Sequence, residues 1–299
     1  MSIKNQKILV TGGKGFIGLH LVKKLRKLGA KVEVYDISVG QNIENLEKVN
    51  TFVKRKYDII YHLAGFSGNA ESNREKLKCF KINTIATVNL FESIIKYSSR
   101  TKIILSSSRL EYGQAKKIPV DEKSPTNPTS MYGLSRLLST QIAFIFRDLY
   151  GLKVTIFRTS NVYGPHKSSK FSGYNVVNHF IDLAKHGDVI TIYGDGEQKR
   201  DYIYIDDLIN AFLLGADDKA SGQVYNVGSG KGIRFKDMAE IIVKNVGKGR
   251  TRLVKWPENY RNVETGSYVS DISKIKKDLG FNPKVSFKSG LDKVLKIIN

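Results

Sequence analysis

Apolar and polar positions alternate along the first half of the chain in a way that predicts strands followed by helices. Short, nearly continuous apolar runs predict strands at Ile8–Val10, Lys31–Tyr35, Tyr57–Ala64, Lys102–Ser107 and Val154–Thr159. Apolar residues at helical spacing predict two long helices between these runs, at Lys76–Tyr97 and Thr129–Tyr150. Strands that alternate with helices indicate an α/β fold with a doubly wound parallel sheet and right-handed crossovers.

The pattern changes after Gly164-Pro165, where a smaller α/β lobe is predicted. A polar loop over 166–173 precedes a predicted helix at 174–186 and a strand at 189–193. We expect a first domain over residues 1–165, with returns to its sheet within 200–227 (in 202–216 and at 224–227). Residues 166–199 and 228–299 would form the second lobe, which ends in a helix at 287–298.

A glycine cluster connects the first strand to the first helix. The segment reads KILVTGGKGFIGLHLVKKLRKL, in which Gly13, Gly15 and Gly18 match G-x-G-x-x-G, and Gly12, Gly15 and Gly18 are spaced three apart. Glycines at such a turn let the backbone approach a pyrophosphate, which then lies over the positive end of the helix dipole. The alternative is a plain strand-to-helix turn. The strand before and the helix after the turn favour a dinucleotide site.

Asp36 stands at the end of the second strand, 21 residues after Gly15. A carboxylate there accepts ribose hydroxyls and repels a 2′-phosphate, so NAD is favoured over NADP, which remains the second option. The alternative is an aspartate that only opens the following turn.

Composition and charge exclude several classes of protein. Cys79 is the only cysteine, so no disulfide forms within the chain, and a reducing compartment, the cytoplasm, is expected. No signal peptide or 18-residue apolar segment is present, so no membrane partner is expected. The net charge of +21 is spread over predicted helix faces and ends, and no RNA-module or zinc-ligand spacing occurs. We therefore predict neither nucleic-acid nor metal binding.

Ser108 and Tyr132 are the candidate acid–base residues. Tyr132 opens a predicted helix 24 residues after Ser108, which ends a predicted strand, and Arg136 lies one helical turn beyond Tyr132. Lowering a tyrosine pKa from about 10 toward neutrality takes about 4 kcal/mol, which a nearby cation and a positive nicotinamide ring can supply. Tyr-x-x-x-Lys/Arg alone is a weak motif, and the glycine turn is what favours the catalytic interpretation.

With these residues in place, the chain resembles an extended short-chain dehydrogenase/reductase, of the NAD-dependent nucleotide-sugar epimerase/dehydratase family that includes UDP-glucose 4-epimerases. The resemblance covers nearly the whole length. Its motifs are TGGKGFIG (11–18), HLAG (62–65), SSSRLEYG (106–113), PTNPTSMYGLSR (125–136), RTSNVYGP (158–165), KRDYIYIDDL (199–208), YNVGSG (225–230), YRNVETG (260–266) and DLGFNP (278–283).

The resemblance implies a role for each matching residue. Residues 1–165 would bind the dinucleotide, and the second lobe would bind a nucleoside-diphosphate sugar. Tyr132 would be the base, supported by Ser108 and Arg136. The implied cofactor contacts are Gly12, Gly15, Phe16, Ile17, Gly18, Asp36, Asn42, Ile43, Leu63, Ala64, Gly65, Tyr132 and Arg136. The implied substrate contacts are Ser108, Asn161, Thr191, Tyr193, and the diphosphate-binding arginines Arg200 and Arg261. The two long helices resemble a family dimer interface, so a homodimer is expected.

Three departures from the family pattern narrow the reaction. Arg136 replaces the family lysine, the segment 37–53 is shortened, and the residues after Ser108 are Arg109 and Leu110. Family dehydratases and decarboxylases need carboxyl groups there, so both reactions are disfavoured. The sequence therefore predicts an NAD-dependent epimerase, most simply at C4, acting through a 4-keto sugar. A 4-ketoreductase that uses NAD(P)H and a non-catalytic NAD(P)-binding regulator remain as alternatives.

Overall fold

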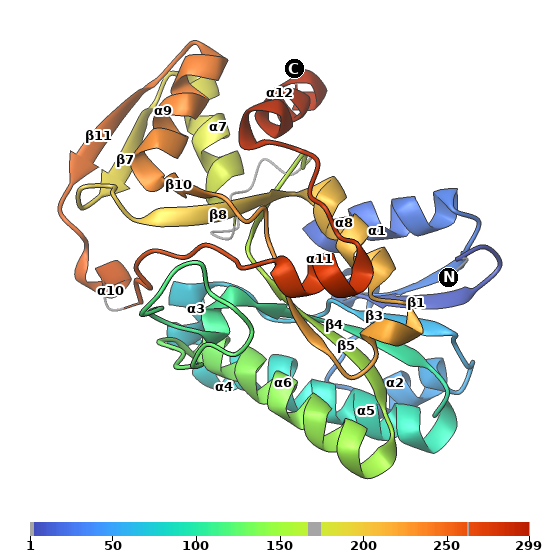
Figure 1. Ribbon diagram of the computed structural model, residues 1–299. Coiled ribbons are helices and arrows are strands. Elements are labelled where there is room, and N and C mark those ends of the chain that lie inside the picture. Colours follow the sequence, from blue (N-terminus) through green and yellow to red (C-terminus); the bar gives the residue numbers. More distant parts are fainter. Residues whose placement is uncertain (1–2, 167–174, 262, 299) are drawn as a thin grey trace.

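The structure is a computed structural model, and it describes residues 3–166, 175–261 and 263–298. Its centre is a six-stranded parallel sheet (Figure 1), which confirms the predicted fold class. In spatial order the strands are β2 (Lys31–Tyr35), β1 (Lys7–Thr11), β3 (Ile59–His62), β4 (Lys102–Ser108), β5 (Lys153–Thr159) and β9 (Val224–Val227). The order reverses between β1 and β3, the place where such sheets bind ligands.

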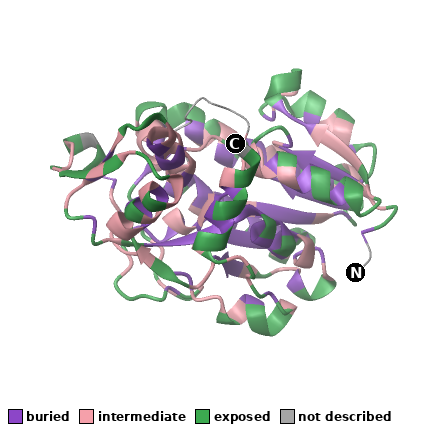
Figure 2. Ribbon diagram, turned by 90° about the horizontal axis from the view of Figure 1, so that it is seen from above, coloured by how far each residue is buried: buried purple, intermediate pink, exposed green. Residues whose placement is uncertain are grey.

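Helices cover both faces of this sheet. One face carries α1 (Phe16–Lys27), α8 (Ile205–Leu214) and α11 (Ser273–Leu279), and the other carries α2 (Leu46–Val53), α5 (Ala86–Tyr97) and α6 (Met131–Tyr150) (Figure 1). Successive residues of a strand point to opposite faces of the sheet: Ile8 and Val10 pack toward α1, and Leu9 packs toward α5. Burial on both faces explains why the strands read as continuous apolar runs. Figure 2 shows these strands as the buried centre of the molecule.

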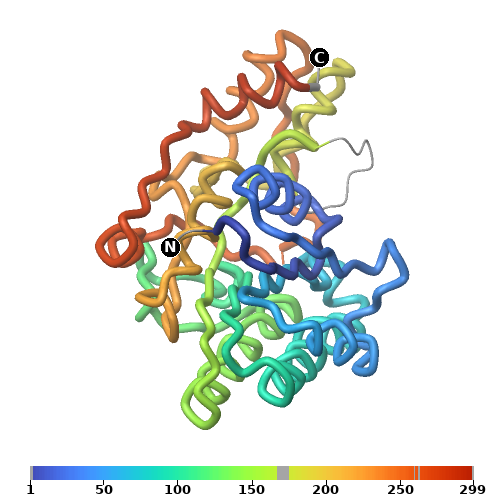
Figure 3. Tube along the Cα trace, turned by 90° about the vertical axis from the view of Figure 1, so that its right-hand side faces the viewer, coloured from blue at the N-terminus to red at the C-terminus, as the bar shows by residue number. Residues whose placement is uncertain are grey.

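The second lobe is built on two small sheets. The first has the order β10 (Gly232–Arg234), β8 (Lys199–Tyr204), β6 (Asn161–Tyr163), and the second pairs β11 (Arg250–Val254) with β7 (Val189–Tyr193). Its helices are α7 (Val176–His186), α9 (Phe235–Val246), α10 (Glu258–Arg261) and α12 (Phe287–Ile298). Figure 3 shows the C-terminal helix α12 beside α9, which it contacts. Apolar side chains of this lobe, such as Phe180 and Ile242, join the same core as β1 and α1.

Two expected elements differ in detail from the structure. The predicted helix at 76–97 is preceded by the short α3 (Asn69–Arg74), begins as α4 (Lys76–Phe80), and widens into one π-helical turn at 81–85 before α5. Of the two segments expected to return to the main sheet, 224–227 does so as β9. The strand at the start of the other segment, β8, instead pairs with β6 and β10. The loop expected over 166–173 lies, apart from His166, outside the described residues.

Within 3–166, 175–261 and 263–298, no helix combines the length and the apolar character that crossing a bilayer requires. The same residues contain no group of three or more His, Cys, Asp or Glu side chains placed to hold a metal ion.

A buried histidine holds the carboxyl end of β3 in place. The His62 ring nitrogens lie 2.8 Å from the Thr11 hydroxyl on β1 and 3.1 Å from the Thr87 hydroxyl on α5. Burial, with a smaller effect from Arg136, lowers the pKa of His62 to about 3. The ring is therefore neutral in the folded protein at neutral pH.

This burial predicts a loss of stability in mild acid. Because the unfolded histidine has a pKa near 6.5 and the folded one a lower pKa, the unfolded state binds the extra proton as the pH falls. The free energy of unfolding should drop by about 2 kcal/mol between pH 7 and pH 5 through this group alone. Urea titrations of His62→Gln should show a flatter pH dependence, whereas a matched change at the exposed His186 should keep the wild-type slope. Equal slopes in all three proteins would contradict the assignment.

Candidate active site

A cavity of about 1240 Å³ lies at the carboxyl edge of the main sheet. Residues that follow β1, β3, β4 and β5 form one side of it. Residues of the second lobe, including Asn178, Arg200 and Glu264, form the other side. The two lobes therefore share one pocket, placed where parallel α/β sheets bind ligands.

The glycine turn between β1 and α1 is packed too tightly for side chains. Gly12 has a φ of +69°, and a Cβ there would lie 2.7 Å from the Ala64 amide nitrogen. A Cβ on Gly18 would lie 2.2 Å from the carbonyl oxygen of Gly12. Gly15 caps α1 without a side-chain acceptor, so no side chain competes with an anion for the first-turn amides. Gly12, Gly15, Phe16, Ile17 and Gly18 all line the pocket, and their contact with the cofactor stays a prediction.

Asp36 opens the turn after β2, as one interpretation of its position suggested, and its predicted contact with a ribose stays a prediction. One carboxylate oxygen accepts from the Ser38 amide at 2.9 Å and so opens a 3₁₀ turn; the other accepts from the Lys14 amide of the glycine turn at 2.8 Å. The side chain also lines the pocket, together with Asn42 and Ile43. Each carboxylate oxygen can accept a further bond, so ribose hydroxyls can still bind there.

Tyr132 is positioned by the first turn of α6. Ser130 caps this helix through the Gly133 amide at 3.2 Å, and the Tyr132 amide donates to Ser72 of α3 at 3.0 Å. A Cβ on Gly133 would lie 2.5 Å from the carbonyl oxygen of Leu110. Glycine at 133 thus lets the start of α6 pack directly on the turn that follows Ser108.

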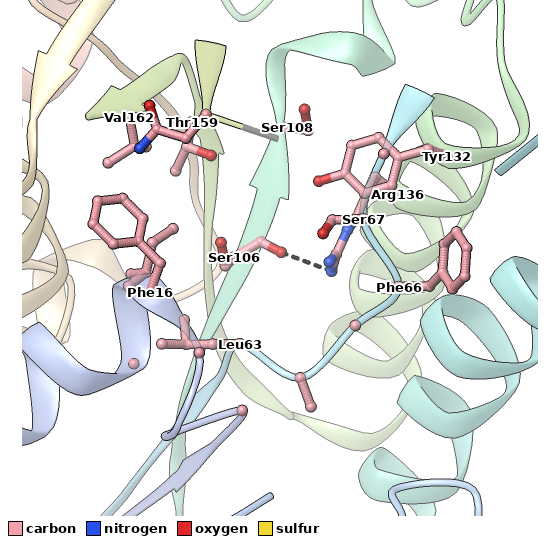
Figure 4. A pocket seen from close by; sticks show the side chains of 18 of the residues that line it. Phe16, Leu63, Phe66, Ser67, Ser106, Ser108, Tyr132, Arg136, Thr159 and Val162 are labelled. Atoms are coloured by element: carbon pink, nitrogen blue, oxygen red, sulfur yellow. Dashed lines mark hydrogen bonds between the residues drawn. The ribbon is translucent and has the colours of Figure 1, made fainter. Parts of the chain in front are cut away.

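Figure 4 shows the Tyr132 hydroxyl pointing into the pocket, with Ser108 entering from the end of β4 on the same side. The Ser108 oxygen accepts from the Leu110 amide at 3.2 Å. This bond uses a lone pair of the serine oxygen, so the hydroxyl proton remains available to a bound group. The structure therefore brings these two predicted residues to one cavity.

Arg136 is buried beside Tyr132. Its guanidinium lies 5.4 Å from the centre of the tyrosine ring, and its Nη1 donates to the Ser106 carbonyl at 3.1 Å (Figure 4). Within the described part of the chain no carboxylate pairs with it, and its buried Nε has no hydrogen-bond partner. A Cβ on Gly65 would lie 2.2 Å from its Nη2, so Gly65, which lines the pocket with Leu63 and Ala64, leaves the space that this arginine fills.

A buried ion pair supports the turn after β4. Glu111 is fully buried and accepts from Arg158 Nε and Thr140 Oγ1, each at 2.8 Å, and from the Ser107 hydroxyl. Burial raises the pKa of Glu111, and the Arg158 guanidinium opposes that rise. Glu111 does not line the cavity, so it acts on the fold and does not serve as an acid or base.

The predicted substrate residues divide into two groups. Asn161 and Arg200 line the pocket; Asn161 donates to the Asp201 carbonyl at 2.9 Å, and Arg200 forms an ion pair with Glu264. Thr191 and Tyr193, on β7, and Arg261, exposed at the end of α10, do not line it. Tyr193 packs instead against Trp256 and Tyr260, with ring centres 5.5 Å apart in each case. The substrate roles of these three residues stay predictions.

Sequence reasoning missed several residues that line the pocket. Lys14, Arg109, Glu264 and Thr265 contribute to its wall. The sequence did contain a signal for Arg109, because this long cationic residue directly follows the candidate serine, Ser108. Glu264 and Thr265 carried no local signal, since only the chain's return from the second lobe brings them to this edge.

The pocket fits NAD on features of the structure itself. The glycine turn keeps side chains away from the start of α1, Asp36 follows β2 at the pocket wall, and Arg136 has a buried Nε with no partner in the described part of the chain. Gly12, Gly15, Asp36 and Arg136 would hold the dinucleotide, and the uncapped start of α1 suits its pyrophosphate.

Known proteins are similar to this chain in sequence and in fold. The sequence model of the NAD dependent epimerase/dehydratase family matches residues 8–228. A Methanocaldococcus jannaschii protein named "Putative UDP-glucose 4-epimerase" is 31% identical over 96% of this chain and 97% of its own. The crystal structure of a Thermotoga maritima UDP-glucose 4-epimerase with UDP-glucose is 31% identical, has a TM-score of 0.88, and covers 98% and 100% of the two chains. A Thermus thermophilus UDP-glucose 4-epimerase in complex with NAD is 25% identical, with a TM-score of 0.86 and coverage of 97% and 99%.

More distant relatives catalyse other reactions. A Bacillus cytotoxicus UDP-N-acetyl-alpha-D-glucosaminuronate decarboxylase is 27% identical and covers 97% of each chain. An Escherichia coli dTDP-4-dehydro-6-deoxyglucose reductase is 27% identical over 100% of this chain and 99% of its own. The comparisons therefore identify the family and its cofactor, NAD, but not one reaction. As its motifs predicted, the chain belongs to the NAD-dependent epimerase/dehydratase family of nucleotide-sugar enzymes.

Proposed function

We propose that this enzyme is an NAD-dependent epimerase that inverts C4 of a nucleoside-diphosphate sugar. The observation that carries the proposal is the arrangement in Figure 4: the Tyr132 hydroxyl faces the pocket beside Ser108, and the Arg136 cation lies on the tyrosine ring. Such an arrangement is suited to moving a proton on and off a sugar hydroxyl.

The carboxylates of the pocket argue against dehydration and decarboxylation. The positions after Ser108 hold Arg109 and Leu110, so no acid or base stands there. Among the described residues, the carboxylates that line the pocket are Asp36, Glu44, Asp182 and Glu264. Asp36 is held at the glycine turn and Glu264 by Arg200.

The chain's own residues would work as follows. Tyr132 removes the proton of the C4 hydroxyl, and Arg136 favours the resulting phenolate. Ser108 donates a hydrogen bond to the same sugar oxygen and keeps it in line with Tyr132. When bound, NAD supplies the chemistry that the side chains lack, acceptance and return of the hydride. The 4-keto sugar then rotates within the pocket so that the hydride returns to the opposite face of C4, and Tyr132 gives the proton back to the C4 oxygen.

Two alternatives rest on particular features. The segment after Asp36 holds only a 3₁₀ turn at 37–39 and the short helix α2, and the reductase from Escherichia coli is among the relatives. Both favour a 4-ketoreductase that uses the nicotinamide cofactor once. Arg136 in place of the family lysine favours a non-catalytic regulator.

Cofactor retention and turnover test the proposal. The epimerase should purify with NAD and interconvert one of the UDP-, dTDP-, GDP- or CDP-sugars, followed by NMR, with no net change in absorbance at 340 nm. Tyr132→Phe should lower turnover by roughly 1,000-fold because the general base is lost. Its affinity for NAD should stay near wild type, and Tyr150→Phe, an exposed tyrosine on the same helix, should keep full turnover.

Each other result selects a different conclusion. Net oxidation of added NAD(P)H by a 4-keto sugar would establish the reductase. Tight NAD binding without turnover of any sugar would favour the regulator. Full turnover by the Tyr132→Phe variant would remove this residue as the base.

Variants that remove or keep the charge test the role of Arg136. Arg136→Met removes the cation beside Tyr132 and should lower kcat by roughly 100-fold, because a nearby positive charge stabilises the phenolate that forms when Tyr132 gives up its proton. Arg136→Lys keeps the charge, so its kcat should stay close to wild type. Equal losses of kcat in the Met and Lys variants would show that Arg136 has only a structural role.

We also infer that the enzyme is a homodimer through α4, α5 and α6. Apolar side chains on α4, on the π-helical turn that leads into α5, and on α6 are exposed: Leu77, Ile85, Leu134, Ile145 and Leu149. The double variant Ile145→Lys/Leu149→Lys should elute as a monomer in size-exclusion chromatography with light scattering, because charges on this surface oppose apolar burial. Leu253→Lys, an equally exposed site on β11, should leave the mass at twice that of one chain. A wild-type protein with the mass of one chain would exclude the dimer.

A further inference from the structure

Arg109 is a cation in the pocket wall that has no acidic hydrogen-bond or ion-pair partner among the described residues. It follows Ser108 in the chain, and its Nε donates to Asn161 Oδ1 at 3.4 Å and its Nη1 to Thr265 Oγ1 at 3.1 Å. Its guanidinium lies 5.3 Å from the centre of the Tyr268 ring. These contacts hold the side chain in one place. None of them neutralises its charge.

The surrounding charges do not balance either. Arg200, a second guanidinium, also lines the pocket and forms an ion pair with Glu264. The two arginines therefore have one carboxylate between them, and it is paired with Arg200. No ion pair among the described residues includes Arg109. Burial and then the nearby Arg200 lower the pKa of Arg109 to about 10, which leaves it charged at neutral pH. Burial raises the pKa of Tyr202 and Tyr268, so both phenols stay neutral.

This imbalance favours binding of an anion from outside the chain. Arg109 is half-buried, and partial shielding of a cation from water without a carboxylate partner makes contact with an anionic ligand favourable. Guanidinium groups present paired N–H donors that match the oxygens of phosphates and carboxylates. Arg109 still has donors at Nη2 that no described side chain uses.

We infer that Arg109 and Arg200 together form a receptor for an anionic oxygen group of the sugar nucleotide, either its diphosphate or a carboxylate on its sugar. The inference rests on the proposed function, since it takes the ligand to be a nucleoside-diphosphate sugar. It assigns to Arg109 a place beside Arg200 that sequence resemblance had assigned to Arg261, which is exposed on α10 and outside the pocket wall.

Binding of plain and acidic ligands to NAD-loaded protein tests the receptor. Calorimetric titrations would use UDP, dTDP, GDP and CDP, then the glucuronate ester of the diphosphate that binds most tightly. Arg109→Gln should raise the Kd of at least one of these ligands by about 10-fold or more. Arg100→Gln removes the same charge from an exposed site and should leave every Kd unchanged. Arg109→Lys, which keeps the charge but loses the planar fork, should fall between the two.

Every outcome has a distinct meaning. A raised Kd for the plain diphosphate identifies the diphosphate as the anion. A raised Kd for the glucuronate ester alone identifies a sugar carboxylate. Unchanged affinities in both Arg109 variants, with NAD affinity and thermal unfolding as in wild type, would overturn the receptor and leave the proposed function intact. A wild-type protein that binds NAD but no nucleoside diphosphate would instead refute the proposed function.

Discussion

The close packing of the start of α6 against the turn after β4 is the constraint on which the site depends. Gly133 has no room for a Cβ beside the Leu110 carbonyl, and the buried Glu111–Arg158 ion pair supports the same turn. This packing places the helix residue Tyr132 and the strand-end residue Ser108 in one cavity. Any side chain at 133 would separate the two elements and so the two hydroxyls.

Polar groups at the carboxyl edge of the main sheet are of two kinds: those paired within the fold, which stabilise it, and those left for a ligand. His62, Glu111 and Asp201 have their polar atoms satisfied by neighbours: Asp201, for example, accepts from the amides of Ser229, Gly230 and Ser270. Arg136 and Arg109 have no acidic partner among the described residues. Because unpaired buried charges are costly, these two arginines are the groups that a ligand is expected to complete.

Family membership leaves the reaction open for a physical reason. The roles proposed for the glycine turn, Tyr132 and Ser108 amount to proton transfer next to a nicotinamide, a step that does not by itself distinguish epimerases, decarboxylases and reductases. What differs is which side chains surround the sugar. Here those positions hold Arg109 and Leu110 and no carboxylate, and that chemistry, more than overall similarity, favours epimerisation.

The sequence by itself determined the parallel sheet, the glycine turn after β1, the place of Asp36 after β2, and the choice of Ser108 and Tyr132, which both line the cavity. Each of these can be recognised from local spacing, from apolar periodicity or from a motif whose residues are close along the chain. Only the tertiary structure decided that Arg136 has no carboxylate partner among the described residues, that Arg109 and Glu264 join the pocket wall, and that Arg261 does not. These outcomes depend on contacts between segments more than 100 residues apart and on which cations find an acidic neighbour. No local pattern encodes either.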